Sequence, residues 1–284
     1  MRPALSLAAV LTAALASGGC ISSATLVKLK ADGSGTVEQT ILMSAKAMEM
    51  MGQTLGKALG DEGQAEPSAP PRSFQEMMGE ADFEKLASRL GPGVRFVSSE
   101  PLTRGDMQGA KVVFAFDDIN KIAIDPTGPT SLSAESPREG ASFKLSRLPD
   151  GAALLTIDMP EDTKTAGDAE ETAGEEESAE ATQKGEDVPP EMAEMMKQML
   201  AGMRFLLDVE VDGSIVRTSS DYVSGSRVTI LELDFDQLLQ QKEALQKLPG
   251  MTRGVSYAQM RTALKSIKGL KFSEPPITIQ FVGR

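Results

Sequence analysis

Apolar and polar residues alternate in many short segments of this chain, as in β-strands with one buried face and one wet face. Asp-Gly pairs separate several of these segments, and Asp-Gly favours tight turns because glycine adopts positive φ angles easily. The pattern predicts three such hairpins, which pair strands 25–30 with 36–43, 142–148 with 152–159, and 205–211 with 215–219.

Further strands are expected outside these hairpins. A wider hairpin joins 94–98 to 111–116, and two more strands cover 227–233 and 277–282, the latter after Pro275-Pro276. Together the alternation predicts about ten strands, and the wet faces indicate antiparallel sheets.

Helical periodicity is confined to fewer segments. Met48, Met51 and two later leucines fall on one face over 44–59. A capping-box pattern at Ser73 opens a helix that restarts at Asp82 and ends at Leu90, before a Gly-Pro-Gly turn. Three more helices are expected at 191–202, 235–247 and 257–268. We therefore expect an α+β fold, in which antiparallel β-hairpins pack against about five helices.

The segment 161–187 holds eleven acidic residues and two lysines, and it has no Val, Ile, Leu, Met or Phe. Such a segment buries too little apolar surface to offset its ordering entropy, so we expect a disordered acidic insert. It divides the chain into an N-terminal β-rich half, 20–160, with a linker at 60–72, and a C-terminal α+β half, 188–284, packed on the first. The insert serves either to solubilise the chain or to attract cations or a basic partner.

Residues 1–19 have the layout of an export signal. Arg2 supplies the positive charge, and the apolar run Ala4–Ala16 is shorter than the ~20 residues that span a bilayer. Small residues then precede Cys20, the single cysteine of the chain, as in the lipobox of bacterial lipoproteins. The sequence predicts a lipoprotein signal peptide at 1–19 and acylation of Cys20, with enough chains, palmitate among them, for stable membrane anchoring.

A second interpretation of the signal remains open. Cleavage after the Ala-x-Ala site at Ala14–Ala16 would leave Cys20 as a free thiol in a secreted protein. In the lipoprotein interpretation, Ile21 follows the cysteine in place of Asp, which favours the periplasmic face of the outer membrane if the source has two membranes.

Composition excludes several kinds of chemistry. The chain of 284 residues has no His, no Trp and one Cys, so Ser-His-Asp catalysis, imidazole metal sites and intrachain disulfides are excluded. Its net charge of -12 argues against nucleic-acid binding. No GxGxxG, P-loop or GxSxG motif is present, and we expect neither an enzyme nor a bound cofactor or metal.

Sixteen methionines, many of them clustered, are the most unusual feature of the composition. Their helical spacing over 192–203 is explained by core packing, but the extra methionines beside that stripe widen the apolar surface. We keep three interpretations: a packed core, an adaptable apolar groove, or thioether coordination of Cu(I). The residues of the possible groove are Met48, Met51, Met192, Met195, Met196, Met199 and Met203.

Two pairs of carboxylates are the remaining catalytic candidates. Asp117 and Asp118 end a predicted strand, and Asp234 and Asp236 lie where a strand meets a helix. Hydrolysis catalysed by paired carboxylates would require both pairs in one cleft. Helix capping and solvation of strand ends explain these four aspartates without any catalytic role.

Two stretches resemble bacterial envelope lipoproteins. Residues 26–44 are similar to the strand–turn–strand that follows the anchor in many of them, and 205–234 resembles the hairpin-plus-strand segment of LppM-type lipoproteins. The matching positions of the second stretch are Gly213, Ile215, Val216, Gly225, Val228 and Thr229. The resemblance implies a β-rich envelope domain that binds a lipid or another envelope component, and it carries no catalytic residues.

The function expected from the sequence is that of a lipid-anchored, non-enzymatic envelope protein that binds a lipid or another apolar ligand. The alternative is a structural or assembly lipoprotein that contacts another envelope protein. The expected partners are therefore the membrane, through the anchor, and a lipid or an envelope protein.

Overall fold

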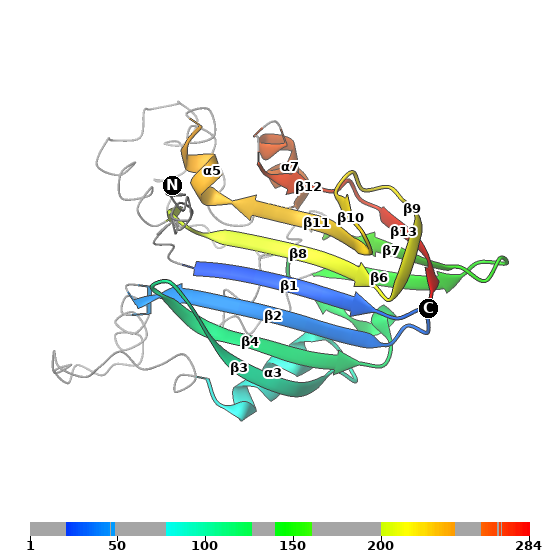
Figure 1. Cartoon of the computed structure of the whole chain (residues 1–284), viewed down its shortest axis with the longest axis horizontal. Helices are drawn as coiled ribbons and strands as arrows, with labels where there is room; N and C mark the ends of the chain where they lie inside the picture. The colour runs from blue at the N-terminus through cyan, green and yellow to red at the C-terminus, as the bar shows by residue number, and fades with distance from the viewer. Residues whose placement is uncertain are drawn as a thin grey trace, which may run out of the picture.

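Two β-sheets lie one behind the other and enclose a shared hydrophobic core (Figure 1). The structure is a computed structural model, and it describes residues 21–45, 47–48, 78–126, 140–160, 200–241, 257–265, 267 and 269–284.

The larger sheet, sheet A, has the strand order β10-β11-β8-β1-β2-β4-β3, and β12 pairs with β11. Neighbouring strands are antiparallel except β1 and β8, which run parallel. Its strands are β1 (Ile21–Leu29), β2 (Gly35–Ser44), β3 (Arg95–Arg104), β4 (Met107–Phe116), β8 (Arg204–Val211), β10 (Val223–Ser224), β11 (Arg227–Asp234) and β12 (Lys271–Phe272).

The smaller sheet, sheet B, has the order β5-β6-β7-β13-β9 and is antiparallel throughout. Its strands are β5 (Ala123–Ile124), β6 (Ala141–Arg147), β7 (Ala153–Asp158), β13 (Ile277–Gly283) and β9 (Gly213–Thr218). Both sheets mix strands from before and after the acidic segment, since β8 pairs with β1 and β13 pairs with β7.

The expected α+β class with about five packed helices is wrong, because the described residues are mostly β. The described residues form thirteen strands and three α-helices, α3 (Glu80–Leu90), α5 (Phe235–Leu239) and α7 (Tyr257–Leu264), with a short 3-10 helix η1 (Ile119–Lys121). The helices expected at 44–59 and 191–202 lie mostly outside the described residues, and the segment 242–247 lies wholly outside them.

All ten predicted strands are present, but one predicted hairpin is wrong. Strands β8 and β9 do not pair; β8 lies in sheet A and β9 in sheet B. The Asp212-Gly213 turn is therefore a corner at which the chain passes from one sheet to the other. A Cβ atom on Gly213 would collide with the carbonyl oxygen of Val282, so this close approach requires glycine.

The hairpin of β3 and β4 is tighter and longer than expected. The strands meet at Gly105, whose φ is +64°, and β3 continues through Pro101 to Arg104. Proline has no N–H to donate to a neighbouring strand, and β3 tolerates it because β3 is the edge strand of sheet A.

The core lies between the two sheets and under the helices. Its fully buried side chains include Val27 of β1, Phe114 of β4, Leu207 of β8 and Phe281 of β13, so each sheet supplies its inner face. Helix α3 adds Phe83, whose ring stacks on Phe96 with centroids 5.4 Å apart.

Candidate functional site

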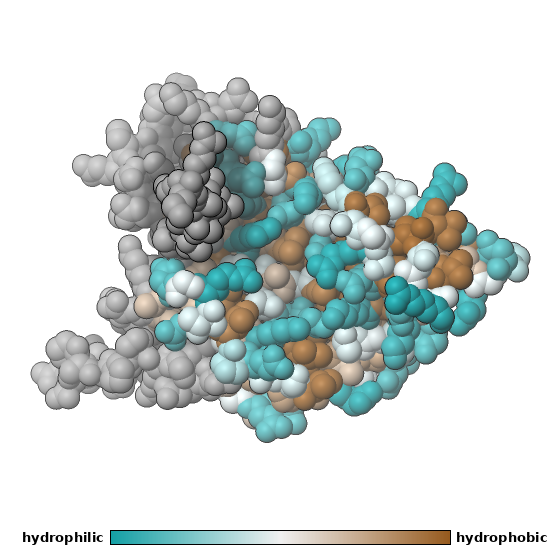
Figure 2. Space-filling view, viewed as in Figure 1, coloured by the Kyte–Doolittle hydropathy of each residue, from teal (hydrophilic) through white to brown (hydrophobic). Residues whose placement is uncertain are grey.

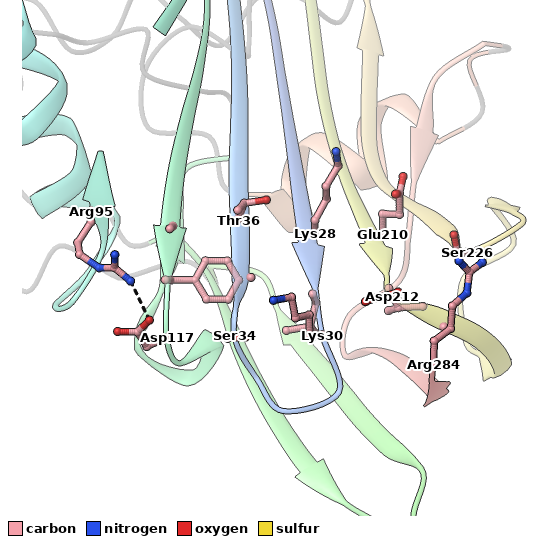
Figure 3. Close-up of a pocket in the computed structure, with 16 residues that line it drawn as sticks. Lys28, Lys30, Ser34, Thr36, Arg95, Asp117, Glu210, Asp212, Ser226 and Arg284 are labelled. Atoms are coloured by element: carbon pink, nitrogen blue, oxygen red, sulfur yellow. Dashed lines mark hydrogen bonds and ion pairs between the residues drawn. The ribbon is translucent and has the colours of Figure 1, made fainter. Parts of the chain in front are cut away.

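A pocket of about 530 Å³ opens where β1, β4 and β8 end and β2 and β9 begin. The turn after β1 and the last residue of the chain, Arg284, complete its wall. Figure 3 shows the charged side chains arranged around the strand ends, from Arg95 on one side to Arg284 on the other.

Apolar side chains form part of the pocket lining. Leu29, Phe116 and Val211 line it, and each is at most 2% exposed, so only a small part of each faces the opening. Gly35 lies against the Lys28 carbonyl and the Phe116 ring, where a Cβ atom would collide with both. The pocket thus combines a limited apolar surface with a charged rim, as small-molecule sites commonly do.

Several charges of the rim are already paired. Lys28 Nζ lies 2.5 Å from Glu38 Oε1, and Lys111 Nζ lies 2.8 Å from Glu38 Oε2. Burial alone would raise the pKa of Glu38, but the hydrogen bonds from Lys111 and Lys28 outweigh burial and lower it. Arg95 donates to Asp117 at 2.9 Å, as the dashed line in Figure 3 marks.

Three further charges of the pocket have no ion pair within the described part of the chain: Lys30, Asp212 and Arg284. Their backbones are nonetheless fixed. The Lys30 N–H donates to the Ser34 carbonyl at 2.9 Å, and the Asp212 N–H donates to the Leu29 carbonyl at 2.8 Å. The Arg284 N–H donates to the Asp212 carbonyl at 3.3 Å, so an unpaired carboxylate and an unpaired guanidinium come from adjacent backbone.

The outer face of sheet A carries a row of charges beside the pocket. Arg227 donates to Glu210 through Nη2 at 2.6 Å, and its Nη1 lies 3.8 Å from Asp208. Asp208 is 5% exposed, and its Oδ1 is buried without a hydrogen-bond partner. Burial raises the pKa of Asp208, although a hydrogen bond with Thr229 and the charge of Arg227 oppose that effect.

A second buried acid on this face, Glu232, is well paired. Arg204 donates to its Oε1, and Lys271 Nζ lies 2.7 Å from its Oε2. Burial would raise the pKa of Glu232, but the hydrogen bonds from Lys271 and Arg204 lower it. Two acids on the same sheet face therefore have pKa values shifted in opposite directions.

The described residues of the sequence-predicted site, Met48 and Met203, lie next to the strand ends at the opposite end of sheet A. Strand β1 begins at Ile21, the residue after Cys20, while β2 ends and β8 begins at the same end, with Ile21 opposite Met43 and Ser22 opposite Arg204. Met48 is buried in the core and Met203 packs against it. Cys20, Met51, Met192, Met195, Met196 and Met199 lie outside the described residues.

We call this end of sheet A the anchor end, defined by Ile21, Met43, Met48, Met203 and Phe205. Phe205 packs edge-to-face on Phe235 with ring centroids 6.1 Å apart. The Phe235 N–H donates to the Met203 carbonyl at 3.0 Å, which ties the start of β8 to α5. Apolar side chains therefore pack where the segment after β2 and the segment before β8, which both carry methionines, join sheet A.

The two carboxylate pairs do not converge. Asp118 caps η1 at the pocket end of β4, and Asp234 caps α5 at the anchor end by accepting from the Gln237 N–H at 3.2 Å. Asp236 accepts from the Gly202 N–H at 2.6 Å. The predicted capping role is confirmed for Asp234, and a cleft shared by the four acids is absent.

Sequence reasoning missed the pocket. Lys28 and Lys30 lie on the wet face of a predicted strand before an Asp-Gly turn, a pattern that any exposed hairpin strand can have and that does not reveal a pocket. Arg284 reaches the same place only because Gly283 pairs with Gly213, and no local pattern reports that pairing.

Two searches of the described residues found nothing. None of their helices is both long enough and apolar enough to cross a bilayer. No group of three or more Cys, Asp or Glu residues among them is placed to hold a metal ion.

No family model and no curated protein matches the chain. Among solved structures, it is similar to the NMR structure of the folded domain of LppM from Mycobacterium tuberculosis. The two are 9% identical, the alignment covers 94% of this chain and 91% of that chain, and the TM-score is 0.34. A likeness at this level carries no argument about fold or function.

Proposed function

We propose that this protein is a lipid-anchored, non-enzymatic component of the bacterial cell envelope that binds an apolar ligand at its anchor end. Acylation of Cys20 would place its acyl chains directly before β1, with no linker between the modified residue and the sheet. The observation that supports the proposal is that β1 begins, one residue after Cys20 in the sequence, at the end of sheet A where β2 ends and β8 begins, next to Met43 and Arg204.

The anchor end offers suitable chemistry for an apolar ligand. Methionine is flexible and polarizable, so it adapts to apolar partners of different shape. Met48 and Met203 join the described core to segments that carry Met50 and Met51 on one side and a cluster from Met192 to Met199 on the other. An apolar molecule bound there would lie next to the membrane that holds the anchor.

Variants of the clustered methionines test the proposed ligand site. The chain should be purified with and without the double substitution Met192→Gln and Met195→Gln, and its co-purifying lipids should be measured by mass spectrometry. We expect the wild type to retain apolar molecules and to bind a fluorescent fatty acid saturably, and the double variant to lose most of both. Val216→Gln, which removes an exposed apolar side chain far from the anchor end, is the control.

The ligand proposal fails if the wild type neither retains apolar molecules nor binds the probe, or if the control loses binding to the same extent. Circular dichroism of each variant separates loss of binding from loss of fold. The tether is tested separately, by the mass of the mature N-terminus.

One observation favours the alternative, an assembly role. Apolar surface gathers over the ends of β9 and β13 (Figure 2), where Val216 is 60% exposed and Val282 is 51% exposed. Strand β9 is also the last strand in the order of sheet B, so among the described strands one of its edges has no partner, and such an edge can pair with another chain. A photocrosslinker placed at Val216 in native membranes would return one partner protein under this alternative and none under the leading proposal.

A further inference from the structure

The pocket at the far end of β1 has chemistry that the anchor end lacks. It offers unpaired charges of both signs beside an apolar surface, and its volume of about 530 Å³ lies in the range of small-molecule sites. β1 has nine residues, so at about 3.3 Å per residue the pocket lies roughly 30 Å from Ile21, at the anchor end of the same strand.

The paired charges of the rim are unavailable to a ligand. Lys28 is held by Glu38, Arg95 by Asp117 and Glu210 by Arg227. A ligand that takes one of these charges must replace an ion pair that already exists, so it gains less from them than from a charge without a partner.

The remaining side-chain charges are two cations, Lys30 and Arg284, and one carboxylate, Asp212. Asp32 lies in the same turn as Lys30, but it already accepts hydrogen bonds from the Ser34 N–H at 2.9 Å and the Ser34 hydroxyl at 2.7 Å. Those bonds, followed by the charge of Lys30, lower the pKa of Asp32. Asp212 has no such side-chain partner among the described residues, so it is free to receive a cation.

We infer that this pocket binds a zwitterionic amino acid or short peptide. The ligand carboxylate pairs with Lys30 or Arg284, the ligand ammonium pairs with Asp212, and an apolar side chain lies on the surface of Leu29, Phe116 and Val211. A purely anionic ligand would leave Asp212 facing like charge, and a purely cationic ligand would leave two cations unmatched. A ligand with both charges is matched by unpaired groups of both signs.

The probes that test this inference are the dipeptide Gly-Phe, its N-acetyl derivative, its C-terminal amide, and free phenylalanine. Binding to the full chain, purified in a non-ionic detergent, is followed by calorimetry at low ionic strength. We expect Gly-Phe to bind saturably, and each blocked derivative to bind about fivefold more weakly, the scale of one exposed charge pair. Free phenylalanine distinguishes an amino-acid site from a peptide site. It should bind as well as the dipeptide if the site takes single amino acids, and more weakly if the site takes peptides.

Substitutions assign each charge to its partner. Asp212→Asn should weaken Gly-Phe about fivefold and leave N-acetyl-Gly-Phe unchanged. The pair Lys30→Gln with Arg284→Gln should weaken Gly-Phe and leave its amide unchanged. The pair Lys144→Gln with Arg104→Gln makes the same change of net charge on exposed strand residues outside the pocket, and it should have no effect.

Ala115→Leu is a second kind of variant, since it keeps every charge and reduces the room in the pocket. We expect it to weaken all four probes. The inference is overturned if no probe binds saturably, if the blocked derivatives bind as well as Gly-Phe, or if the control pair weakens binding equally. None of these results depends on Cys20 or on the methionines, so failure here leaves the proposed function standing.

Discussion

Two buried carboxylates on one face of sheet A show how local partners decide the effect of a charge. Asp208 is buried with one oxygen unpartnered, whereas Glu232 has a cation on each oxygen. The pKa of Asp208 is therefore raised and that of Glu232 is lowered. The first charge opposes folding near neutral pH and the second supports it.

Asp208→Asn should raise the melting temperature at pH 7, because it removes a buried charge and leaves Arg227 paired with Glu210. A raised pKa means that the cost of the charge is present above the folded pKa and is relieved as the pH falls. The difference from wild type should therefore shrink through that pKa and disappear below about pH 3.9, the unfolded value. Melting curves from pH 3 to 8 measure this, and a variant less stable than wild type at pH 7 would contradict it.

Glu232→Gln should have the opposite effect, with a loss of about 1–2 kcal/mol at pH 7 from two charge-assisted hydrogen bonds. Since the pKa of Glu232 is lowered, its contribution is present above the unfolded value of about 4.3 and is lost as the pH falls through the folded pKa. Urea unfolding at pH 7 and pH 3 measures the change. The two variants are matched, because each neutralises one buried acid of the same sheet. Equal changes of stability in the same direction would refute the opposite roles of Asp208 and Glu232.

At the scale of elements, local alternation identifies strands but not their partners. The alternation located ten strands, and it missed β5, β10 and β12 because two residues carry no period. It also joined β8 to β9, since the Asp212-Gly213 pair looks like any hairpin turn. The corner is set by a contact distant in sequence, between Gly213 and Val282. The expected number of helices was also wrong. α5 and α7 begin as expected at Phe235 and Tyr257, but much of the rest of the described chain is strand.

The corner makes Gly213 more sensitive than an ordinary turn glycine. Gly213→Ala should cost about 3 kcal/mol, because the new methyl meets backbone of β13 that cannot move without disturbing sheet B. Gly105→Ala, at a hairpin with open space around the glycine, should cost about 1 kcal/mol from its positive φ alone. Thermal unfolding at pH 7 compares the two, and an equal cost would show that the corner has room to adjust.

At the scale of the whole molecule, the two ends of sheet A have different chemistry. The anchor end gathers buried methionine and phenylalanine side chains beside paired charges, and the pocket end carries unpaired charges at the other end of β1. The signal layout, the lone cysteine and the clustered methionines of the first are local patterns that the sequence displays, and the anchor they predict stays a prediction. The second was not predictable, because the pocket collects Lys30, Asp212 and Arg284 from three distant parts of the sequence.

This arrangement predicts how the body is oriented on a membrane. Once Cys20 is acylated, an introduced cysteine is the only free thiol of the chain. A fluorophore on Ala45→Cys, exposed just after β2 at the anchor end, should be quenched by brominated lipids. A fluorophore on Ser34→Cys, in the turn at the pocket end, should not be. Equal quenching would mean that sheet A lies flat on the bilayer.

Mass spectrometry of the mature N-terminus, taken from fractionated cells, tests whether Cys20 anchors this protein to a membrane. We expect a membrane-bound chain that begins at Cys20 and carries acyl chains on that residue, and a Cys20→Ser variant that is no longer processed to this form. A mature chain beginning at Ser17, with an unmodified thiol at Cys20 and found in the soluble fraction, would contradict it.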